Sequence, residues 1–149
     1  MKIVVVSDSH RNHPALEMVL RQEPDADLYL HAGDVEEDPK AVFPFICVKG
    51  NCDYFISDSM RIIPLGKHRL YLTHGHLFYL TRENIIKIAK QNDCDIFIHG
   101  HIHKYYYEYV DGVHIICPGS ISRPRDSKKS YVVISIENEN VLVTYKVTE

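Results

Sequence analysis

The fold is most constrained by a short β-branched run at the start of the chain that polar residues end abruptly. Residues 2–7 read KIVVVS, and Asp8 and His10 follow almost directly. A short apolar run with polar ends is typical of a central strand that is covered on both faces. The sequence therefore predicts a buried strand over residues 2–7, with Asp8 and His10 at its carboxyl end.

The same arrangement, a predicted strand with polar residues just beyond it, recurs along the chain. Short apolar runs predict further strands at residues 27–31, 45–49, 61–65, 68–73 and 95–98. Apolar residues at helical spacing predict one helix from Pro14 to about Gln22 and another after an N-cap at Thr81. The polar residues just past these strands are Asp34, Asn51, His74, His101 and His103. Because open α/β sheets bind ligands at the carboxyl ends of their strands, these side chains are expected to share one site.

The last third of the chain predicts strands only. They cover residues 105–110, 113–117, 131–137 and 141–147, with a turn at Asp111-Gly112. A mixed α/β part followed by an antiparallel β part suggests two packed sheets with helices outside. The length of 149 residues, without repeats or linker-like stretches, predicts one domain over residues 1–149.

Composition argues against several classes of protein. Apolar residues make up 45% and charged residues 25%, which is typical of a globular chain rather than a disordered one. A net charge of −3 lacks the basic excess of a dedicated nucleic-acid binder, so no stable nucleic-acid complex is expected. No apolar run approaches the ~20 residues of a spanning helix and no signal-peptide pattern begins the sequence, so a cytoplasmic location without membrane association is expected. The four cysteines lack CxxC spacing and are expected to be free, mostly buried thiols.

Histidine is the commonest metal ligand in proteins, and the chain has 10 histidines. Half of them gather in two short segments, at His74, His76, His99, His101 and His103. Alternate positions of an extended segment point to the same side, so His101 and His103 can reach neighbouring ions. A surface loop with spare histidines is the rival interpretation. Oxygen and imidazole donors suit a metal that keeps positions open for water, which four-cysteine coordination does not.

Five short motifs occur in a fixed order along the chain. They are Asp8-Ser9-His10, Gly33-Asp34, Gly50-Asn51-Cys52-Asp53, Thr73-His74-Gly75-His76 and Gly100-His101-Ile102-His103. In this order they resemble the motifs of calcineurin-like metallophosphoesterases, and most closely the small bacterial and archaeal phosphodiesterase branch. The resemblance covers residues 1–122. It implies an α/β fold built as a four-layer α-β-β-α sandwich, in which two facing mixed β-sheets are flanked by helices.

The resemblance also implies an activity and a metal centre. Enzymes of this kind hydrolyse phosphodiesters, or monoesters, with a water that two divalent metal ions activate. Carried over residue by residue, the first metal is held by Asp8, His10, Asp34 and His103. The second is held by Asp34, Asn51, His74 and His101, so that Asp34 bridges the two ions. Mn²⁺ is the expected metal, and Fe, Ni, Co and Zn suit the same mixed donors.

One position departs from the wider family. Cys52 stands where many relatives have a histidine that is thought to assist the leaving group. A neutral thiol is a poor general acid, so His76, a metal-bound water or no group at all is expected to take this role. His76 is accordingly the candidate catalytic residue, and hydrogen bonding to a metal ligand is its alternative role. Cys52 is expected to be a small packed side chain, Asp53 to form a turn, and His99 to be a hydrogen-bond partner of a ligand.

Several further features leave alternatives open. The basic residues Arg123, Arg125, Lys128 and Lys129 form either a solvated loop or a contact for a small phosphorylated substrate, the expected partner. Residues 105–107, three tyrosines, either stack a nucleobase or form an edge or subunit interface, which is compatible with a homodimer. Two rival functions are a protein-interaction scaffold, a role that the same fold has in eukaryotic membrane-coat assemblies, and a structural zinc protein with closed coordination.

Overall fold

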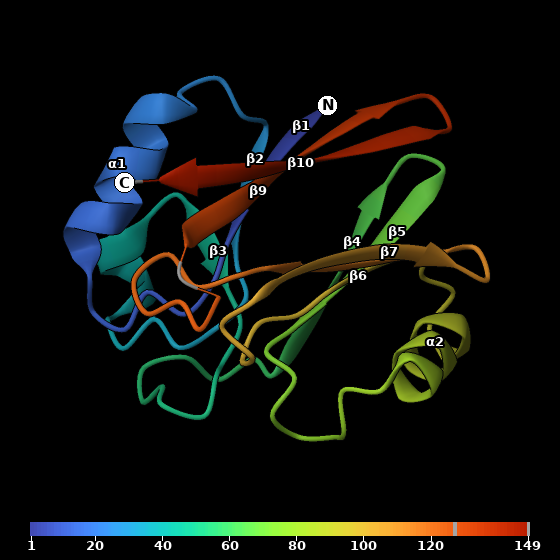
Figure 1. Cartoon of the computed structure of the whole chain (residues 1–149), viewed down its shortest axis with the longest axis horizontal. Helices are drawn as coiled ribbons and strands as arrows, with labels where there is room; N and C mark the ends of the chain where they lie inside the picture. The colour runs from blue at the N-terminus through green and yellow to red at the C-terminus, as the bar shows by residue number, and fades with distance from the viewer. Residues whose placement is uncertain (127, 149) are drawn as a thin grey trace.

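The computed structural model describes residues 1–126 and 128–148, so Glu149, the end of the predicted domain, lies outside the described residues. Sheet A contains β1 (Lys2–Val6), β2 (Leu28–His31), β3 (Phe45–Cys47), β9 (Lys129–Glu137) and β10 (Asn140–Thr148). Sheet B contains β4 (Met60–Leu65), β5 (His68–Thr73), β6 (Ile96–Ile98), β7 (Tyr105–Val110) and β8 (Val113–Pro118). The strand orders are β10-β9-β1-β2-β3 in sheet A and β4-β5-β6-β8-β7 in sheet B (Figure 1).

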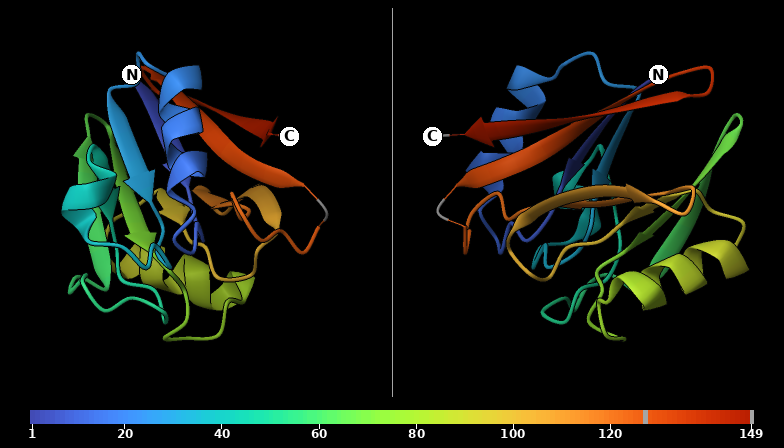
Figure 2. Two further views of the ribbon diagram at one scale, coloured as in Figure 1. Left: turned by 90° about the vertical axis from the view of Figure 1, so that its left-hand side faces the viewer. Right: turned by 45° about the vertical axis from the view of Figure 1, so that its right-hand side comes forward.

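The alternation of side chains along β1 builds the layers of the molecule. Ile3 and Val5 belong to the core between the two sheets, whereas Val4 and Val6 pack beneath α1 (His13–Gln22). On the other side, α2 (Arg82–Gln91) covers the outer face of sheet B. Figure 2 shows the two helices on opposite outer faces of the paired sheets. The α-β-β-α sandwich of two mixed sheets is therefore confirmed.

The local signals of the sequence position the elements well. Every predicted strand is present, and its ends lie within two residues of the prediction. Asn12 caps α1 by accepting the N–H of Ala15, and Thr81 caps α2 as predicted, by accepting the N–H of Asn84. The short 3-10 helix η1 (Pro39–Val42) was not predicted, because one turn is too short to show a period.

The division of the last four strands between the two sheets was not predicted either. The pair β7 and β8 joins sheet B, whereas β9 pairs antiparallel with β1 and brings β10 to the edge of sheet A. The sequence suggested a mixed α/β part followed by an antiparallel part along the chain, but it did not show how these strands divide between the two mixed sheets. Strand pairing depends on tertiary packing, which short-range patterns do not encode.

The carboxyl ends of the parallel strands of both sheets meet at one place. In sheet A, β1, β2 and β3 run parallel, and in sheet B, β5, β6 and β8 do so. The sheets are tied together just beyond these ends, where the N–H of Ile121 donates to the carbonyl of Ser7 (3.1 Å). This edge therefore collects the polar residues that follow the strands. No helix within the described part of the chain is long and apolar enough to cross a membrane.

Candidate metal centre

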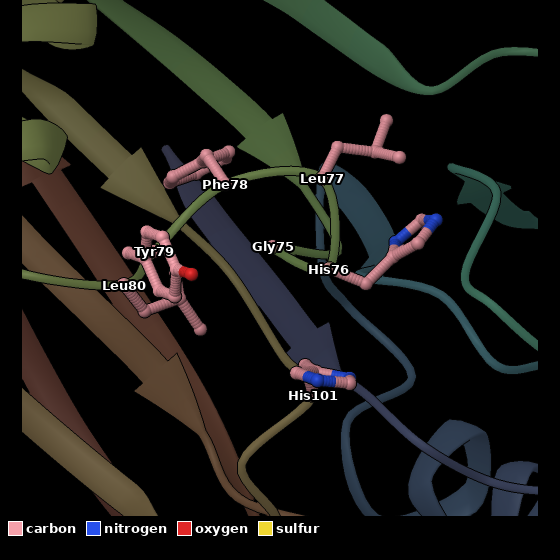
Figure 3. A pocket seen from close by; sticks show the side chains of 7 residues that line it. All are labelled: Gly75, His76, Leu77, Phe78, Tyr79, Leu80 and His101. Atoms are coloured by element: carbon pink, nitrogen blue, oxygen red, sulfur yellow. The ribbon is translucent and has the colours of Figure 1, made fainter.

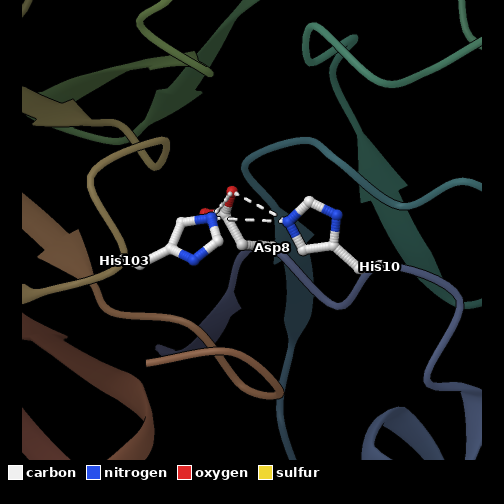
Figure 4. Close-up of side chains that lie close together, drawn as sticks. All are labelled: Asp8, His10 and His103. Atoms are coloured by element: carbon white, nitrogen blue, oxygen red, sulfur yellow. Dashed lines mark hydrogen bonds and ion pairs between the residues drawn. The ribbon is translucent and has the colours of Figure 1, made fainter. Parts of the chain in front are cut away.

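Asp8 lies where the edges of the two sheets meet, and its side chain is fully buried. Its Oδ2 accepts hydrogen bonds from the hydroxyl of Ser7 (2.5 Å) and the backbone N–H of His101 (3.1 Å). Its Oδ1 has no hydrogen-bond partner among residues 1–126 and 128–148, although Nε2 of His103 lies 3.1 Å away and Nε2 of His10 3.8 Å away (Figure 4). An unpaired buried carboxylate oxygen is costly unless a cation faces it. Oδ1 of Asp8 is therefore suited to the role of a metal ligand.

The imidazoles of His10, His74 and His103 all direct Nε2 toward Oδ1 of Asp8. The Nδ1 of each lies close to an atom that accepts hydrogen bonds. These acceptors are the Glu36 carboxylate for His10 (2.9 Å), the Ala32 carbonyl for His74 (2.8 Å) and the Arg123 carbonyl for His103 (2.6 Å). In the neutral rings each Nδ1 must therefore carry the hydrogen, which leaves Nε2 with a free lone pair. Fixed imidazoles with free Nε2 atoms beside a carboxylate form a ligand set for a divalent cation.

His74 connects these residues to a second group of donors. Its Nε2 lies 3.0 Å from Oδ1 of Asn51 and 3.3 Å from Nδ1 of His101. Oδ2 of Asp34 lies 3.4 Å from the same Nε2 of His74 and 3.8 Å from Nε2 of His10. One oxygen of Asp34 thus faces both groups. The structure brings together all seven residues that the sequence suggested as metal ligands.

The backbone at these ligands is unusual. Five of the seven have φ between 46° and 75°, namely Asp8, His10, Asp34, His101 and His103. Residues with a Cβ rarely adopt this left-handed region, and Asp and His are among those that tolerate it best. Such a concentration of strained residues is typical of a functional site, where the surrounding structure holds them.

Close approach of the backbone explains two of the motif glycines. A Cβ on Gly100 would press on the hydroxyl of Ser7 and lie 2.8 Å from Oδ2 of Asp8. A Cβ on Gly50 would press on both the carboxylate and the backbone nitrogen of Asp34. Any side chain at these positions would displace the carboxylates.

The metal-free centre favours charged carboxylates and the protonation of two imidazoles, those of His74 and His103. Burial opposes the ionisation of Asp34, but His74 and the N–H of Cys52 hold its pKa well below the usual range. Burial likewise opposes a charge on His74, yet Asp34 and Asp8 raise its pKa. Asp8 also raises the pKa of His103. Protons and metal ions therefore compete for the same imidazole nitrogens.

Comparison with known proteins agrees with this geometry. Residues 1–139 match the family model of the calcineurin-like phosphoesterase superfamily domain. The chain belongs to this superfamily. It is 33% identical over 153 residues to the probable metallophosphoesterase YsnB of Bacillus subtilis, which covers 97% of this chain and 90% of that protein. It is 30% identical over 155 residues to the phosphodiesterase YfcE of Escherichia coli, which covers 84% of this chain and 82% of that protein.

Solved structures share the fold of this calcineurin-like phosphoesterase. A predicted phosphoesterase from Streptococcus pneumoniae superimposes with a TM-score of 0.89 at 28% identity, over 98% of this chain and 88% of that chain. Vps29 of Entamoeba histolytica, in complex with Zn²⁺, gives 0.76 at 21% identity over 99% of both chains, which shows likeness of fold alone. The relation to the small bacterial and archaeal branch is confirmed, and membership supports metal-dependent hydrolysis of phosphoesters.

Asp53 does more in this phosphoesterase than form the expected turn. Its buried carboxylate accepts three backbone N–H groups, from Asp34 (2.8 Å), Glu36 (2.7 Å) and Gly50 (2.8 Å). The loops after β2 and β3 are thereby fastened to each other. The signal was present in the motif, because Asp53 lies only two residues beyond Asn51, but a sequence does not reveal that the partners come from another loop.

His31 also supports the centre, although the sequence suggested only a structural or surface role. It is fully buried, its Nδ1 accepts the N–H of Gly33 (3.1 Å), and its Nε2 therefore donates to the hydroxyl of Ser9 (2.8 Å). It thus links the loop that carries Asp34 to the loop after β1. His99 was expected to bond a ligand side chain, and its Nδ1 instead bonds the carbonyl of Gly100 (2.9 Å).

His76, the candidate catalytic residue, borders the second group of ligands. Its ring centroid lies 5.4 Å from that of His74 and 6.4 Å from that of His101. Together with His101 and residues 77–80 it lines an open pocket of about 550 Å³ (Figure 3). Burial and the neighbouring His74 and His101 lower the pKa of His76, and its buried Nδ1 has no partner in the described part of the chain.

The expectation for Cys52 is wrong in one respect. Cys47, Cys94 and Cys117 are buried free thiols as expected, but Cys52 is exposed. Its backbone N–H donates to Oδ1 of Asp34 (2.9 Å), and its side chain lines the same pocket as His10 and Asp34. Burial and the charge of Asp34 raise the pKa of this thiol, which keeps it neutral.

Proposed function

We propose that the chain hydrolyses phosphodiesters, with monoesters as a second substrate class, at a centre of two divalent metal ions. The observation that carries the proposal is Oδ1 of Asp8, which is buried, lacks a hydrogen-bond partner in residues 1–126 and 128–148, and faces Nε2 of His10 and His103. Family membership supports the same chemistry. We further propose that residues 1–149 act as one domain on a small phosphorylated substrate, without a stable nucleic-acid complex.

The proposed ligand sets follow the two groups of donors. Asp8, His10, Asp34 and His103 would hold one ion. Asp34, Asn51, His74 and His101 would hold the other. The bridging role of Asp34 is supported by its Oδ2, which faces both groups while its Oδ1 is occupied by the N–H of Cys52. Mn²⁺ is the proposed metal, and Fe, Ni, Co or Zn would suit the same oxygen and imidazole donors.

Two bound divalent ions would acidify a water and neutralise charge on the phosphoryl oxygens during in-line attack. The chain itself holds these donors still. Glu36 fixes the ring of His10, and Asp53 fixes the loops that carry Asp34 and Asn51. Orientation of this kind, set before the substrate binds, is what makes such a centre effective.

His76 is proposed to donate a hydrogen bond to the leaving group or to a phosphoryl oxygen. Because its pKa is lowered, the ring is largely neutral near pH 7 and is a weak proton donor. The neutral thiol of Cys52 adds little acid assistance. The enzyme is therefore expected to favour substrates with good leaving groups, such as nitrophenyl esters.

The rival function is a protein-interaction scaffold on the same fold. It is favoured by large apolar or aromatic side chains that are highly exposed, among them Phe43 (81%), Tyr54 (94%), Leu77 (67%) and Tyr79 (85%). The likeness to Vps29 at the level of the fold supports the same alternative. A scaffold requires no turnover, so hydrolysis separates the two functions.

The test is the hydrolysis of bis-(p-nitrophenyl) phosphate and p-nitrophenyl phosphate by protein stripped with EDTA, before and after Mn²⁺ is added. Asp34→Asn is the inactive variant, and Asp111→Asn is its matched control, because Asp111 is an exposed turn residue whose positive φ asparagine also tolerates. Cleavage that Mn²⁺ restores in the wild type and in Asp111→Asn, but not in Asp34→Asn, is expected. The absence of cleavage with every metal, despite two bound ions, would favour the scaffold.

A further inference from the structure

The loop between β8 and β9 brings two arginines to the metal centre. An open pocket of about 420 Å³ contains His10, Asp34 and His103, and its wall also includes Arg123 and Arg125. Both arginines are exposed residues. The sequence left these residues as either a solvated loop or a contact for a phosphorylated substrate, and their place in the pocket wall favours the contact.

The backbone of this loop is fastened to the metal ligands. The carbonyl of Arg123 accepts the Nδ1–H of His103 (2.6 Å), and the N–H of Arg125 donates to the carbonyl of His103 (2.8 Å). The N–H of Arg123 also donates to the hydroxyl of Ser120 (2.7 Å), which itself donates to the carbonyl of Asp8 (2.8 Å). The backbone of both arginines is therefore held in a fixed position relative to His103 and Asp8.

Neither guanidinium has a carboxylate to pair with in residues 1–126 and 128–148. Four other arginines each lie within 4.0 Å of a carboxylate oxygen, namely Arg11, Arg21, Arg61 and Arg82. The acidic residue next to the pair, Asp126, instead accepts the backbone N–H groups of Tyr105 (2.9 Å) and Lys128 (3.5 Å). Two guanidiniums that line this pocket, and that pair with no carboxylate among the described residues, are suited to an anion of the ligand.

The charge of the centre indicates which anion this is. Two divalent ions at the proposed centre would already balance the carboxylates of Asp8 and Asp34, a hydroxide formed from the attacking water, and the single negative charge of a phosphodiester. Two additional cations are not needed for that reacting group, whereas a phosphate elsewhere on the substrate carries enough charge to engage both. A guanidinium can bind a phosphate with two parallel hydrogen bonds.

Building on the proposed function, we infer that Arg123 and Arg125 bind a second phosphate of the substrate. The preferred substrate class is then a phosphodiester that carries an additional phosphate group, as nucleotide derivatives with two phosphates do. The reacting ester lies at the metal ligands, and the second phosphate lies on the side of the pocket formed by the loop before β9. The two arginines determine specificity and are not required for the chemical step.

The test compares two chromogenic diesters that differ by one phosphate, thymidine 5′-(p-nitrophenyl phosphate) and its 3′-phosphorylated form. The measured quantity is the ratio of their kcat/KM values with Mn²⁺. The wild type is expected to prefer the phosphorylated form about tenfold, and Arg123→Ala/Arg125→Ala is expected to lose this preference. Lys128→Ala/Lys129→Ala removes the same charge from the adjacent exposed positions and should keep the preference. The preference should also weaken as salt is added.

The outcomes separate this inference from the proposed function. If both diesters are cleaved but the ratio in the wild type is near one, or the arginine and lysine variants give the same ratio, the inference is wrong and the phosphodiesterase stands. If the metal-loaded wild type cleaves neither diester nor bis-(p-nitrophenyl) phosphate, both are wrong. Metal content, measured in each variant, should equal that of the wild type, because neither arginine side chain is a proposed ligand.

Discussion

The edges of the two sheets contribute different chemistry to one centre. Sheet A supplies every carboxylate and the amide, from Asp8, Asp34 and Asn51 after its three parallel strands, together with His10. Sheet B supplies only imidazoles, from His74, His101 and His103. In the proposed centre, the negative charge that attracts a cation would therefore come from sheet A alone, and sheet B would complete the coordination with imidazoles. Neither edge alone supplies the full set of proposed ligands.

The support behind the donors differs in the same way. On sheet A, side chains hold the ligand loops, through the carboxylates of Asp53 and Glu36 and the imidazole of His31. On sheet B, backbone carbonyls hold two of the three imidazoles, that of Ala32 for His74 and that of Arg123 for His103. Substitutions can remove the first kind of support but not the second. The centre should therefore be most sensitive to mutation on the side of sheet A.

The largest effect is expected from a direct contrast between the two donor types. Asp34→Asn removes the carboxylate that faces both groups of ligands, so it should lose both ions and reduce turnover by at least about 10²-fold. His101→Asn removes one neutral donor from one group and should keep one ion. Metal analysis after dialysis measures the number of bound ions, and assays with a nitrophenyl diester measure the turnover of each variant. Two tightly bound ions in active Asp34→Asn would contradict the assigned bridge.

The second effect concerns the carboxylate that fastens two loops of sheet A. Asp53→Ala should lower the free energy of unfolding by about 3 kcal/mol, because three backbone N–H groups lose a charged acceptor. Metal affinity should also fall, by about 10- to 100-fold. Urea unfolding and Mn²⁺ titration are the measurements. Asp58→Ala, an exposed carboxylate of the same loop, is the control and should change neither by much.

A smaller effect is expected where only one imidazole loses its support. Glu36→Gln weakens the hydrogen bond that orients His10 and should lower metal affinity about tenfold. The adjacent Glu37→Gln is matched in chemistry, but Glu37 faces His13, which is not in the centre. Equal affinities in these two variants would show that the ring of His10 needs no carboxylate to hold it.

The smallest effect on the metal centre is expected from a substitution that alters the pH dependence of stability in the metal-free protein. Burial lowers the pKa of His31 to about 3, whereas a histidine in the unfolded chain titrates near 6.5. Below pH 6.5 the unfolded state binds a proton at His31 that the folded state does not bind. The contribution of His31 to the free energy of unfolding is therefore complete above pH 6.5 and is lost as the pH falls toward 3. Its slope approaches about 1.4 kcal/mol per pH unit.

His31→Gln removes this titration while leaving an acceptor for the N–H of Gly33. Urea unfolding of both proteins between about pH 4 and 7 should give a shallower curve for the variant. Identical slopes would show that His31 is not the group that resists protonation.

The sequence predicted the features that short-range patterns encode. The ends of β1 and β2, and hence the positions of Asp8 and Asp34, follow from apolar runs with polar ends. The assembly of the ligands at one edge follows from the rule for parallel strands, and their roles remain a prediction. The triple contact of Asp53, the exposure of Cys52 and the place of Arg125 in the pocket wall depend on loops that meet only in the folded chain, so no local pattern contains them.

The pairing of β1 with β9 has a consequence for biosynthesis. The amino group of Met1 donates to the carbonyl of Ile136, 135 residues further along, and hydroxyls of Ser120 and Ser122 hold the carbonyl of Asp8. Contacts between such distant residues form slowly, and here they require residues 120–136 to have left the ribosome. Until then β1 is an unpaired edge on one side and Asp8 is not held in place. We therefore expect the proposed centre to bind metal ions only after β9 has paired with β1.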